Sequence, residues 1–402
     1  MNTLRTIAFS SLTSTTRGHA PLLILAALFA ALPATLPAQR HWGVAPLPII
    51  AYSPDTGGMF GAAAIFFYGP DVGVPEEQRQ GFRNNTAAVN AIVTTNGSWI
   101  GALSGTNFLQ DERYRWDNAV YGNRAPGVYF GIGDDTDDME TYLAETVGVE
   151  TTLSRRIVQN LFIGPLYQYE WTSILETDDD GALSGPDWSG SGDSGSERTV
   201  GGPETGGNTG EETILGSDGT TVVSGPGIAV IWDSTGGVFW PTRGARANGE
   251  IRTFSEITGS TSDFGLYSLR YVQYIPVAGR HVLAVQGRFH GSWGEVPFQH
   301  LPSIGGDGVM RGLLAGRYRD TVAAIAGAEY RVPVGRSLGV VAFGSVGQVG
   351  PDLGSMDMKE LKSAVGLGFR VALNREQKLN LRIDIAVSPD GLAPYVNMGE
   401  AY

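Results

Sequence analysis

Lys378–Ser388 reads KLNLRIDIAVS and decides the fold class, because every second residue in it is apolar. The apolar face consists of Leu379, Leu381, Ile383, Ile385 and Val387. Arg382 and Asp384 lie on the opposite face, and this period of two is typical of a β-strand between unlike environments. In a transmembrane barrel these environments are lipid and a wet lumen. In a soluble sandwich, the charges would face water and the apolar faces would face each other.

The same alternation recurs along most of the chain. Strands are predicted at 46–53, 58–68, 83–95, 98–108, 113–121, 140–154, 157–172, 221–232, 244–255, 262–274, 279–292, 321–332, 337–348, 360–373, 377–388 and 391–402. Their number is even, as in bacterial single-chain barrels. The sequence therefore predicts a 16-stranded antiparallel transmembrane β-barrel over residues 46–402. The long links 173–220 and 293–320 are expected outside the cell.

The first 38 residues have the pattern of a cleaved secretory signal peptide. Two arginines precede an apolar run that is shorter than a membrane-spanning helix, and small residues follow it up to Ala38. Residues 39–45 are then a short periplasmic segment before the barrel. The chain contains no cysteine, which excludes a lipoprotein attachment site and a disulfide framework.

Charge and composition exclude several classes of function. The net charge of −13 argues against nucleic acid as a partner, and much of it lies in the acidic link 173–220. Asp178–Asp180 in that link lacks the alternating ligand spacing of a calcium loop, so no metal site is predicted. The histidines lack metal-ligand spacing and no serine lies in a nucleophile elbow. We therefore predict no enzyme, no catalytic residue and no cofactor.

The link Leu301–Asp320, LPSIGGDGVMRGLLAGRYRD, combines several glycines with one central arginine, Arg311. Glycine permits backbone conformations closed to other residues and close approach to neighbouring chain. The guanidinium group is planar and always charged, which suits it to pairing with carboxylates. This composition predicts a loop folded tightly into a confined space, and a flexible surface loop is the alternative. The candidate residues of this loop are Gly305, Gly306, Val309, Arg311 and Gly312.

Several segments match motifs of one known group of proteins. Four of them are Val309–Gly312 (VMRG), Asp233–Gly244 with its Phe239-Trp240-Pro241, Phe343–Gly347 (FGSVG) and Asn397–Tyr402 (NMGEAY). Tyr52–Gly57 and Tyr129–Gly133 add to the match. Taken together, residues 46–402 resemble the outer membrane protein 85 superfamily, also called bacterial surface antigen or BamA/TamA-type barrels.

The resemblance implies that Arg311 reaches into the lumen and contacts the later strands. The family commonly has an aspartate at the position of Ser345, so the usual partner is missing here. The candidate partners of the loop arginine are Glu329, Asp384 and Ser345. Alternatively, the two carboxylates pair only with Arg331 and Arg382, as hydrated lumen charges. The resemblance also marks Gly399 and Tyr402 as parts of a C-terminal insertion signal.

Two functions are consistent with such a barrel in the bacterial outer membrane. The first is insertion or transport of proteins or lipids through a weak seam between the first and last strands. Pro48 and Pro394 would reduce the number of hydrogen bonds across this seam, because proline has no N–H to donate. Family members with this activity carry periplasmic POTRA domains. This sequence is expected to be a barrel-only member, with a possible separate periplasmic partner. Its other expected contacts are outer-membrane lipid and the barrel-assembly machinery.

The alternative function is a passive or loop-plugged pore without insertase activity. A barrel of 16 strands can enclose an aqueous channel. Arg331, Arg370 and Arg382 would then bias passage towards anions.

Overall fold

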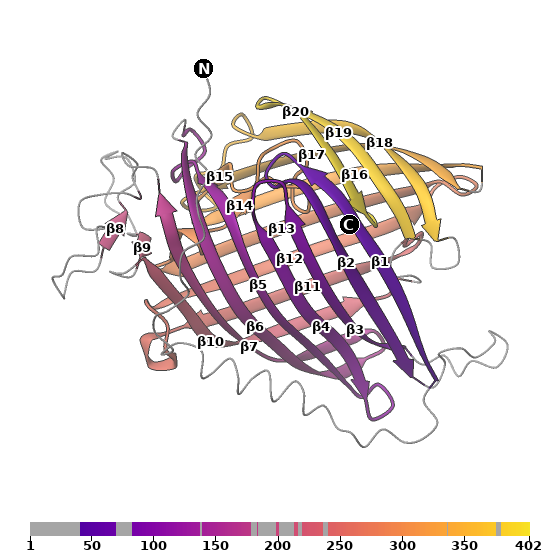
Figure 1. Cartoon of the computed structure of the whole chain (residues 1–402), viewed down its shortest axis with the longest axis horizontal. Coiled ribbons are helices and arrows are strands. Elements are labelled where there is room, and N and C mark those ends of the chain that lie inside the picture. Colours follow the sequence, from indigo (N-terminus) through magenta and orange to yellow (C-terminus); the bar gives the residue numbers. More distant parts are fainter. Residues whose placement is uncertain are drawn as a thin grey trace.

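The alternating segments form the wall of a closed barrel (Figure 1). The computed structural model describes residues 41–69, 83–136, 139–177, 183, 198–200, 213–215, 219–235, 240–335, 337–374 and 379–402. Within these residues, 16 strands pair with their neighbours in chain order, and the last closes on the first. All these pairings are antiparallel, so the predicted fold class is confirmed.

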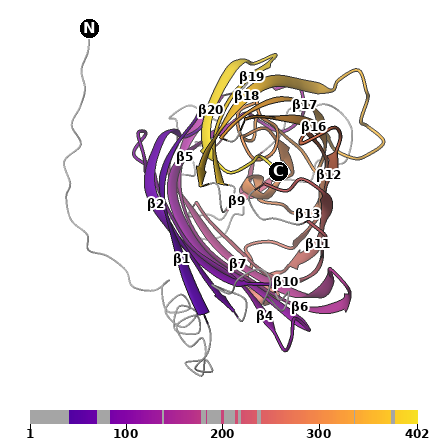
Figure 2. The same ribbon diagram turned by 90° about the vertical axis from the view of Figure 1, so that its right-hand side faces the viewer.

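The strands of the wall are 8 to 19 residues long. They are β1 (His41–Ser53), β2 (Gly57–Gly69), β3 (Asn85–Thr94), β4 (Trp99–Leu109), β5 (Tyr114–Tyr129), β6 (Glu140–Val158), β7 (Leu161–Thr177), β10 (Thr220–Asp233), β11 (Gly244–Phe254), β12 (Phe264–Pro276), β13 (Val282–Gly294), β16 (Val322–Val334), β17 (Leu338–Gly350), β18 (Lys362–Asn374), β19 (Leu379–Ser388) and β20 (Gly391–Met398). Figure 2 looks into one open end of the barrel, and the C-terminus of the chain lies within the ring of strands.

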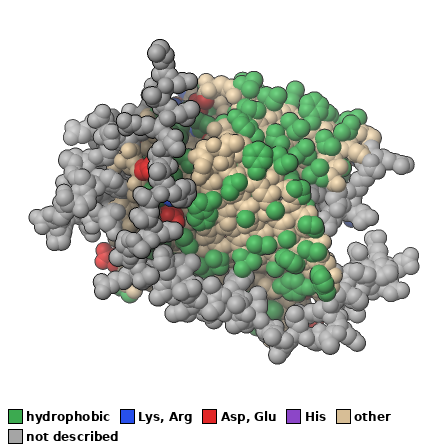
Figure 3. Space-filling view, viewed as in Figure 1, with side chains coloured by type: hydrophobic (Ala, Val, Ile, Leu, Met, Phe, Trp, Pro, Cys, Tyr) green, Lys and Arg blue, Asp and Glu red, His purple; other side chains and the backbone are tan. Residues whose placement is uncertain are grey.

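Apolar side chains cover the outside of the wall. On β18, Val365, Leu367 and Phe369 are more than 60% exposed, whereas Arg370 on the other face is 2% exposed. Hydrophobic side chains are spread over the strands in Figure 3, and acidic side chains lie near the left-hand margin of that face. An apolar outer band with charges turned inward is the arrangement that a bilayer selects. The described residues contain no helix that is long and apolar enough to cross a membrane.

The two ends of the barrel differ in their connections. One end, here called the turn end, carries short links such as 277–281 between β12 and β13 and 335–337 between β16 and β17. The other, the loop end, carries the link between β13 and β16 with the 3-10 helix η3 (Phe298–His300) and the paired strands β14 (Ser303–Ile304) and β15 (Tyr318–Arg319). The link between β7 and β10 contains a second pair, β8 (Arg198–Val200) and β9 (Thr213–Leu215).

The first strand begins earlier than predicted. β1 starts at His41, so most of the expected periplasmic segment 39–45 belongs to the wall, and its ladder with β2 runs from His41 opposite Gly69 to Ser53 opposite Gly57. Prolines at 46 and 48 interrupt the local strand signal, but the pairing with β2 overrides it. β5 also continues to Tyr129, past the predicted end at 121, because Pro126 is held in the ladder opposite Leu143 on β6.

The last strand ends earlier than predicted. β20 stops at Met398, and the expected strand 391–402 is therefore wrong at its end. Gly399 has a φ of +82°, and its N–H still donates to the Asn380 carbonyl at 2.9 Å. A positive φ is favoured only for glycine, so the chain turns inward at this residue.

Some predictions fall on residues outside the described ranges. These are the signal peptide at 1–38 and the calcium-like Asp178–Asp180 in the acidic link.

We expect Leu367→Lys to lower the free energy of unfolding in a lipid bilayer by about 2–4 kcal/mol, because it puts a charge on the lipid-facing surface near the middle of a strand. Leu353→Lys, in the link between β17 and β18, is the matched control, because Leu353 is 61% exposed but outside the wall. Urea unfolding in vesicles measures both, and equal effects would contradict a lipid-facing β18.

Candidate functional site

The candidate site is the contact between the glycine-rich loop Leu301–Asp320 and the inner face of the wall. Arg311 in this loop is 4% exposed. Its Nη2 donates to Glu329 Oε2 on β16 at 2.6 Å, and its Nη1 donates to Asp384 Oδ2 on β19. Both carboxylates are fully buried. The structure thus brings two of the three candidate partners to Arg311.

Ser345 is not a partner of Arg311, and this expectation was wrong. No hydrogen bond joins the two residues in the described chain, where Ser345 lies on β17 between Gly327 and Ala364. The neighbouring Phe343 contacts the arginine instead, with its ring centroid 3.6 Å from the guanidinium carbon. The aromatic face attracts the cation, and the carboxylates on other strands supply the negative charge that Ser345 lacks.

A connected network of four arginines and four carboxylates surrounds this contact in the described chain. Its members are Arg311, Arg331, Arg370, Arg382, Asp307, Glu329, Asp384 and Glu400. Arg331 Nε lies 2.7 Å from Glu329 Oε1, and Arg370 Nη1 lies 2.6 Å from Asp384 Oδ1. The carboxylates pair with the wall arginines as well as with Arg311, and both are fully buried, so the alternative of hydrated charges that pair only with Arg331 and Arg382 is wrong.

The formal charges of this network cancel. A buried charge is tolerated only when it is paired and hydrogen-bonded, because losing water costs several kcal/mol per ion. Burial alone lowers the pKa of the Arg311 guanidinium, but Glu329 and Asp384 outweigh burial and raise that pKa above its usual value. Arg311 therefore stays charged. Arg331, Arg370 and Arg382 each have a carboxylate partner, which weakens the expected anion bias of a pore.

Two members of the network, Glu400 and Asp307, were not predicted from the sequence. Glu400 was read as part of a terminal signal, yet it lies 2.8 Å from Arg370 Nε and accepts from Asn380 Nδ2 at 3.1 Å. Asp307 in the loop accepts hydrogen bonds from Arg382 and from Asn397 Nδ2. The clue for Glu400 was Gly399, a residue able to reverse the chain just before it.

Glycine is required at two points of the loop. A β-carbon on Gly312 would lie 2.8 Å from that of Ala364 on β18, and Gly312 has a φ of +113°. A β-carbon on Gly305 would lie 1.8 Å from the Leu314 carbonyl oxygen. Gly306 has a positive φ as well. These residues let the loop pack Met310 and Leu313 against the wall residues Ile325, Val349 and Ala364.

The loop contacts the strands on both sides of the barrel closure. Gly312 N–H donates to the Tyr395 hydroxyl on β20 at 3.0 Å, and Ser388 Oγ donates to the Gly312 carbonyl at 2.8 Å. Ala315 N–H donates to Asp55 Oδ1, in the turn between β1 and β2, at 2.7 Å. The loop therefore touches the first and the last hairpin of the wall.

Every segment that carried the family resemblance meets this loop or its network. Trp240 lies 5.2 Å from the Arg331 guanidinium, and Pro241 accepts a hydrogen bond from Arg331 Nη1 at 3.5 Å. Gly133 N–H donates to the Arg319 carbonyl at 2.8 Å. Tyr402 lies with its ring centroid 5.7 Å from the Arg311 guanidinium, and its carbonyl accepts from Arg331 Nη2. Segments far apart in the sequence thus contact the same loop and its ion-pair network.

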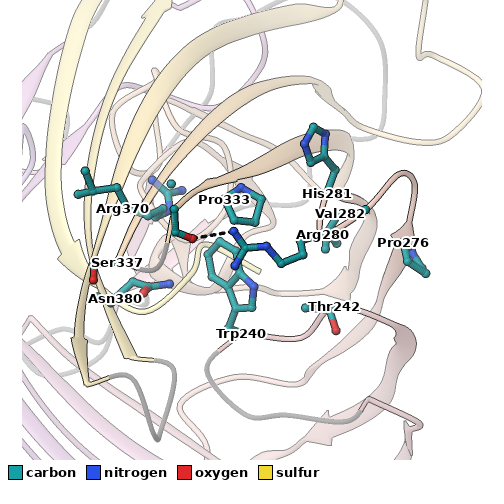
Figure 4. A pocket seen from close by; sticks show the side chains of 15 residues that line it. Trp240, Thr242, Pro276, Arg280, His281, Val282, Pro333, Ser337, Arg370 and Asn380 are labelled. Carbon is teal, nitrogen blue, oxygen red and sulfur yellow. Dashed lines mark hydrogen bonds between the residues drawn. The ribbon is translucent and has the colours of Figure 1, made fainter.

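A pocket of about 480 Å³ opens at the turn end of the barrel (Figure 4). Trp240, Arg280, His281 and Asn380 line it, and Arg370 joins it to the ion-pair network. Arg280 Nη2 donates to the Gly335 carbonyl at 2.6 Å, the dashed line in Figure 4. The pocket combines an aromatic side chain with basic groups next to the rim.

We expect Arg311→Gln to lower the free energy of unfolding by about 3–5 kcal/mol, because it leaves Glu329 and Asp384 short of one buried positive charge. Urea unfolding in detergent measures the change. Arg113→Gln removes an exposed arginine in the link between β4 and β5 and should change stability by no more than about 0.5 kcal/mol. Equal stability of the two variants would contradict the role of Arg311.

Asp320, at the end of the loop, makes stability depend on pH. Burial raises the pKa of its carboxyl to about 6; the Thr321 N–H opposes this, and Asp134 and Asp352 add to it. The folded state then binds this proton more tightly than the unfolded chain, so its stabilising effect is full below about pH 4 and disappears as pH rises through 6.

We therefore expect the wild type to lose about 1–2 kcal/mol of stability between pH 4 and 7 relative to Asp320→Asn, since a shift of two units is reduced by solvent screening. Thermal unfolding of both proteins across this range measures the difference. Parallel pH curves would show that Asp320 ionises as in the unfolded chain.

Comparison with known proteins agrees with this fold. The model of the Omp85 superfamily domain matches residues 83–391. No curated protein matches the sequence. The structure resembles BamA from Haemophilus ducreyi lacking POTRA domains 1–3, at 12% identity and a TM-score of 0.57, over 90% of this chain and 70% of that one.

Two structures of CdiB are also similar. CdiB from Escherichia coli is 12% identical with a TM-score of 0.53, over 90% of this chain and 63% of that one. CdiB from Acinetobacter baumannii is 12% identical with a TM-score of 0.50, over 88% and 59%. This chain thus spans less than two thirds of either CdiB chain. At such identities the likeness shows a shared fold.

Proposed function

Because this chain belongs to the Omp85 superfamily, we propose that it is an outer-membrane barrel that aids insertion or transport of proteins or lipids through the seam between β1 and β20. This function requires no catalytic group, metal or cofactor. It involves outer-membrane lipid around the wall, the barrel-assembly machinery during insertion and a separate periplasmic partner. That partner would meet the turn end of the barrel, where the pocket beside Trp240 and Arg280 opens.

The observation that carries the proposal is the shortness of the seam. β1 and β20 share a single pair of residues in register, Tyr52 opposite Val396. By contrast, all 13 residues of β1 pair with β2, and all eight residues of β20 pair with β19. Strand edges without a full partner present free N–H and C=O groups, which can template another strand.

Two features of the chain keep the seam short. Pro48 and Pro394 lie on the strands that meet there, and a proline has no N–H to donate to a ladder. The inward turn at Gly399 then removes the last residues from the wall. Glu400 is held by Arg370 inside the barrel, so the ion-pair network competes with extension of β20 along β1.

A disulfide across the seam tests the proposal. Because the chain has no native cysteine, the two introduced cysteines can pair only with each other within one molecule. We expect oxidised Tyr52→Cys/Val396→Cys to lose most of its ability to promote insertion of an unfolded barrel protein into vesicles, because the edges can no longer separate. Reduction should restore the activity. Directly opposed residues in an antiparallel pair are close enough for such a bond.

Ile383→Cys/Val396→Cys is the matched control. It shares one substitution but joins β19 to β20, which already pair fully, so oxidation should leave activity unchanged. Retained activity in the oxidised seam variant would overturn the proposal. The same variants separate it from the alternative of a loop-plugged pore, because conductance through the lumen does not need an open seam.

A further inference from the structure

Two arginines face each other on the inner wall without a carboxylate between them. Arg270 on β12 lies directly opposite Arg288 on β13. Both are on the inner face, because their neighbours Leu269 and Tyr271 are among the exposed residues of the outer face. Like charges directly opposite each other in a sheet repel and destabilise it. A negative charge between the two arginines would remove this repulsion.

The barrel contains a second such pair that is neutralised. Arg370 on β18 lies directly opposite Arg382 on β19. There Asp384 bridges the two, at 2.6 Å from Arg370 Nη1 and 3.4 Å from Arg382 Nη1. In the described chain, no carboxylate lies within ion-pair distance of Arg270 or Arg288. Within the described residues, the protein thus supplies a carboxylate to the Arg370–Arg382 pair but none to the Arg270–Arg288 pair.

Two inner-wall carboxylates on β10 and β11 are already engaged. Glu250 on β11 lies 2.6 Å from Arg252 Nη2. Asp233, at the end of β10, lies 3.2 Å from Arg246 Nε. Rotating either carboxylate towards Arg270 would break an existing ion pair, so neither of them neutralises the arginine pair in this structure.

Donors at the pair remain without acceptors. Arg288 donates from Nη2 to the Gly308 carbonyl of the loop at 2.5 Å and from Nε to Gln286 Oε1 at 3.3 Å. Arg270 Nε, in contrast, is buried and has no hydrogen-bond partner among the described residues. Tyr274, four residues along the same face of β12, is 1% exposed, and its hydroxyl has no partner there either. A buried donor without an acceptor destabilises the folded state, because it has lost its hydrogen bonds to water.

A cavity of about 290 Å³ lies on the same inner face as the pair. Ser268 and His290, each two residues from one of the paired arginines, line it together with Glu250 and Arg252, whereas Arg270 and Arg288 are not part of its lining. The loop residue Val309, next to the Gly308 that Arg288 binds, forms another part of its wall.

We propose that Arg270 and Arg288 bind a phosphate-type oxyanion inside the barrel. The guanidinium fork of Arg270 presents parallel N–H groups that match the oxygen atoms of such an anion, which a spherical halide does not. Arg288 adds the donors that Gly308 and Gln286 leave free. The anion would supply the negative charge that Asp384 supplies to the second pair. Because Arg288 also donates a hydrogen bond to the Gly308 carbonyl, a bound anion stabilises the contact between the loop and the wall.

The test is thermal unfolding and calorimetric titration of the full chain in a neutral detergent, with inorganic phosphate as the probe and sodium chloride at equal ionic strength as the reference. We expect saturable binding and a rise in melting temperature with phosphate, since a ligand of the folded state stabilises it. Arg270→Gln and Arg288→Gln should each weaken phosphate binding at least about tenfold, which corresponds to loss of a charged hydrogen bond.

Arg113→Gln, which removes an exposed arginine, is the control and should bind like the wild type. Arg270→Lys retains the charge and loses the fork, so intermediate affinity is expected. The glutamine variants should be as stable as the wild type in phosphate-free buffer, because they remove a repulsion. Equal phosphate binding in Arg270→Gln and Arg113→Gln would overturn the proposal.

A second titration with a soluble short-chain phosphatidic acid separates the two sources of the anion. Arginine-dependent binding of both probes, or of inorganic phosphate alone, supports a site for the free ion. Arginine-dependent binding of the lipid alone supports a site for a phosphorylated headgroup. No saturable binding of either probe would contradict the site.

Discussion

The buried contact of Arg311 with Glu329 and Asp384 is the interaction on which the interior of this barrel depends. A guanidinium ion inside a protein needs carboxylates at hydrogen-bond distance, and here they come from β16 and β19. That requirement fixes where the loop lies. Once the loop is held there, Met310 and Leu313 pack on the wall and Gly312 approaches Ala364 closely. The loop thereby joins parts of the wall that share no ladder.

The same network links the loop to the seam. Glu400 leaves the wall to pair with Arg370, while Tyr395 and Asp55 bind the loop from the two hairpins that meet at the closure. The end of β20 at Met398 thus coincides with charge pairing of Glu400 inside the barrel, and both strands of the short seam contain prolines. The barrel is closed, and its strands pair along their length everywhere except between β1 and β20. That combination is the physical basis of the function proposed for this member of the Omp85 superfamily.

Local patterns in the sequence were enough to predict the number of wall strands and the direction of their side chains, but not the bounds of β1, β5 and β20. Alternation alone placed Glu329 and Asp384 on the inner face, and the glycines identified the loop. The positions of Glu400 and Asp307 follow from contacts between residues far apart in the chain, which no local period encodes. Ser345 was wrong because the family pattern says which position usually bears the anion, whereas the structure supplies that charge from other strands. Pro126 shows the same limit, since ladder pairing overrides a local turn signal.

The most direct test of this account is a double-mutant cycle between Arg311→Met and Asp384→Asn, measured by urea unfolding in detergent. Residues in direct contact within one ion-pair network show interaction energies of about 0.5–3 kcal/mol, whereas independent sites add within about 0.5 kcal/mol. The account predicts a coupling near the upper end of that range, about 2–3 kcal/mol, since both groups are buried. Additive effects of the two substitutions would show that the loop is held in place by other contacts.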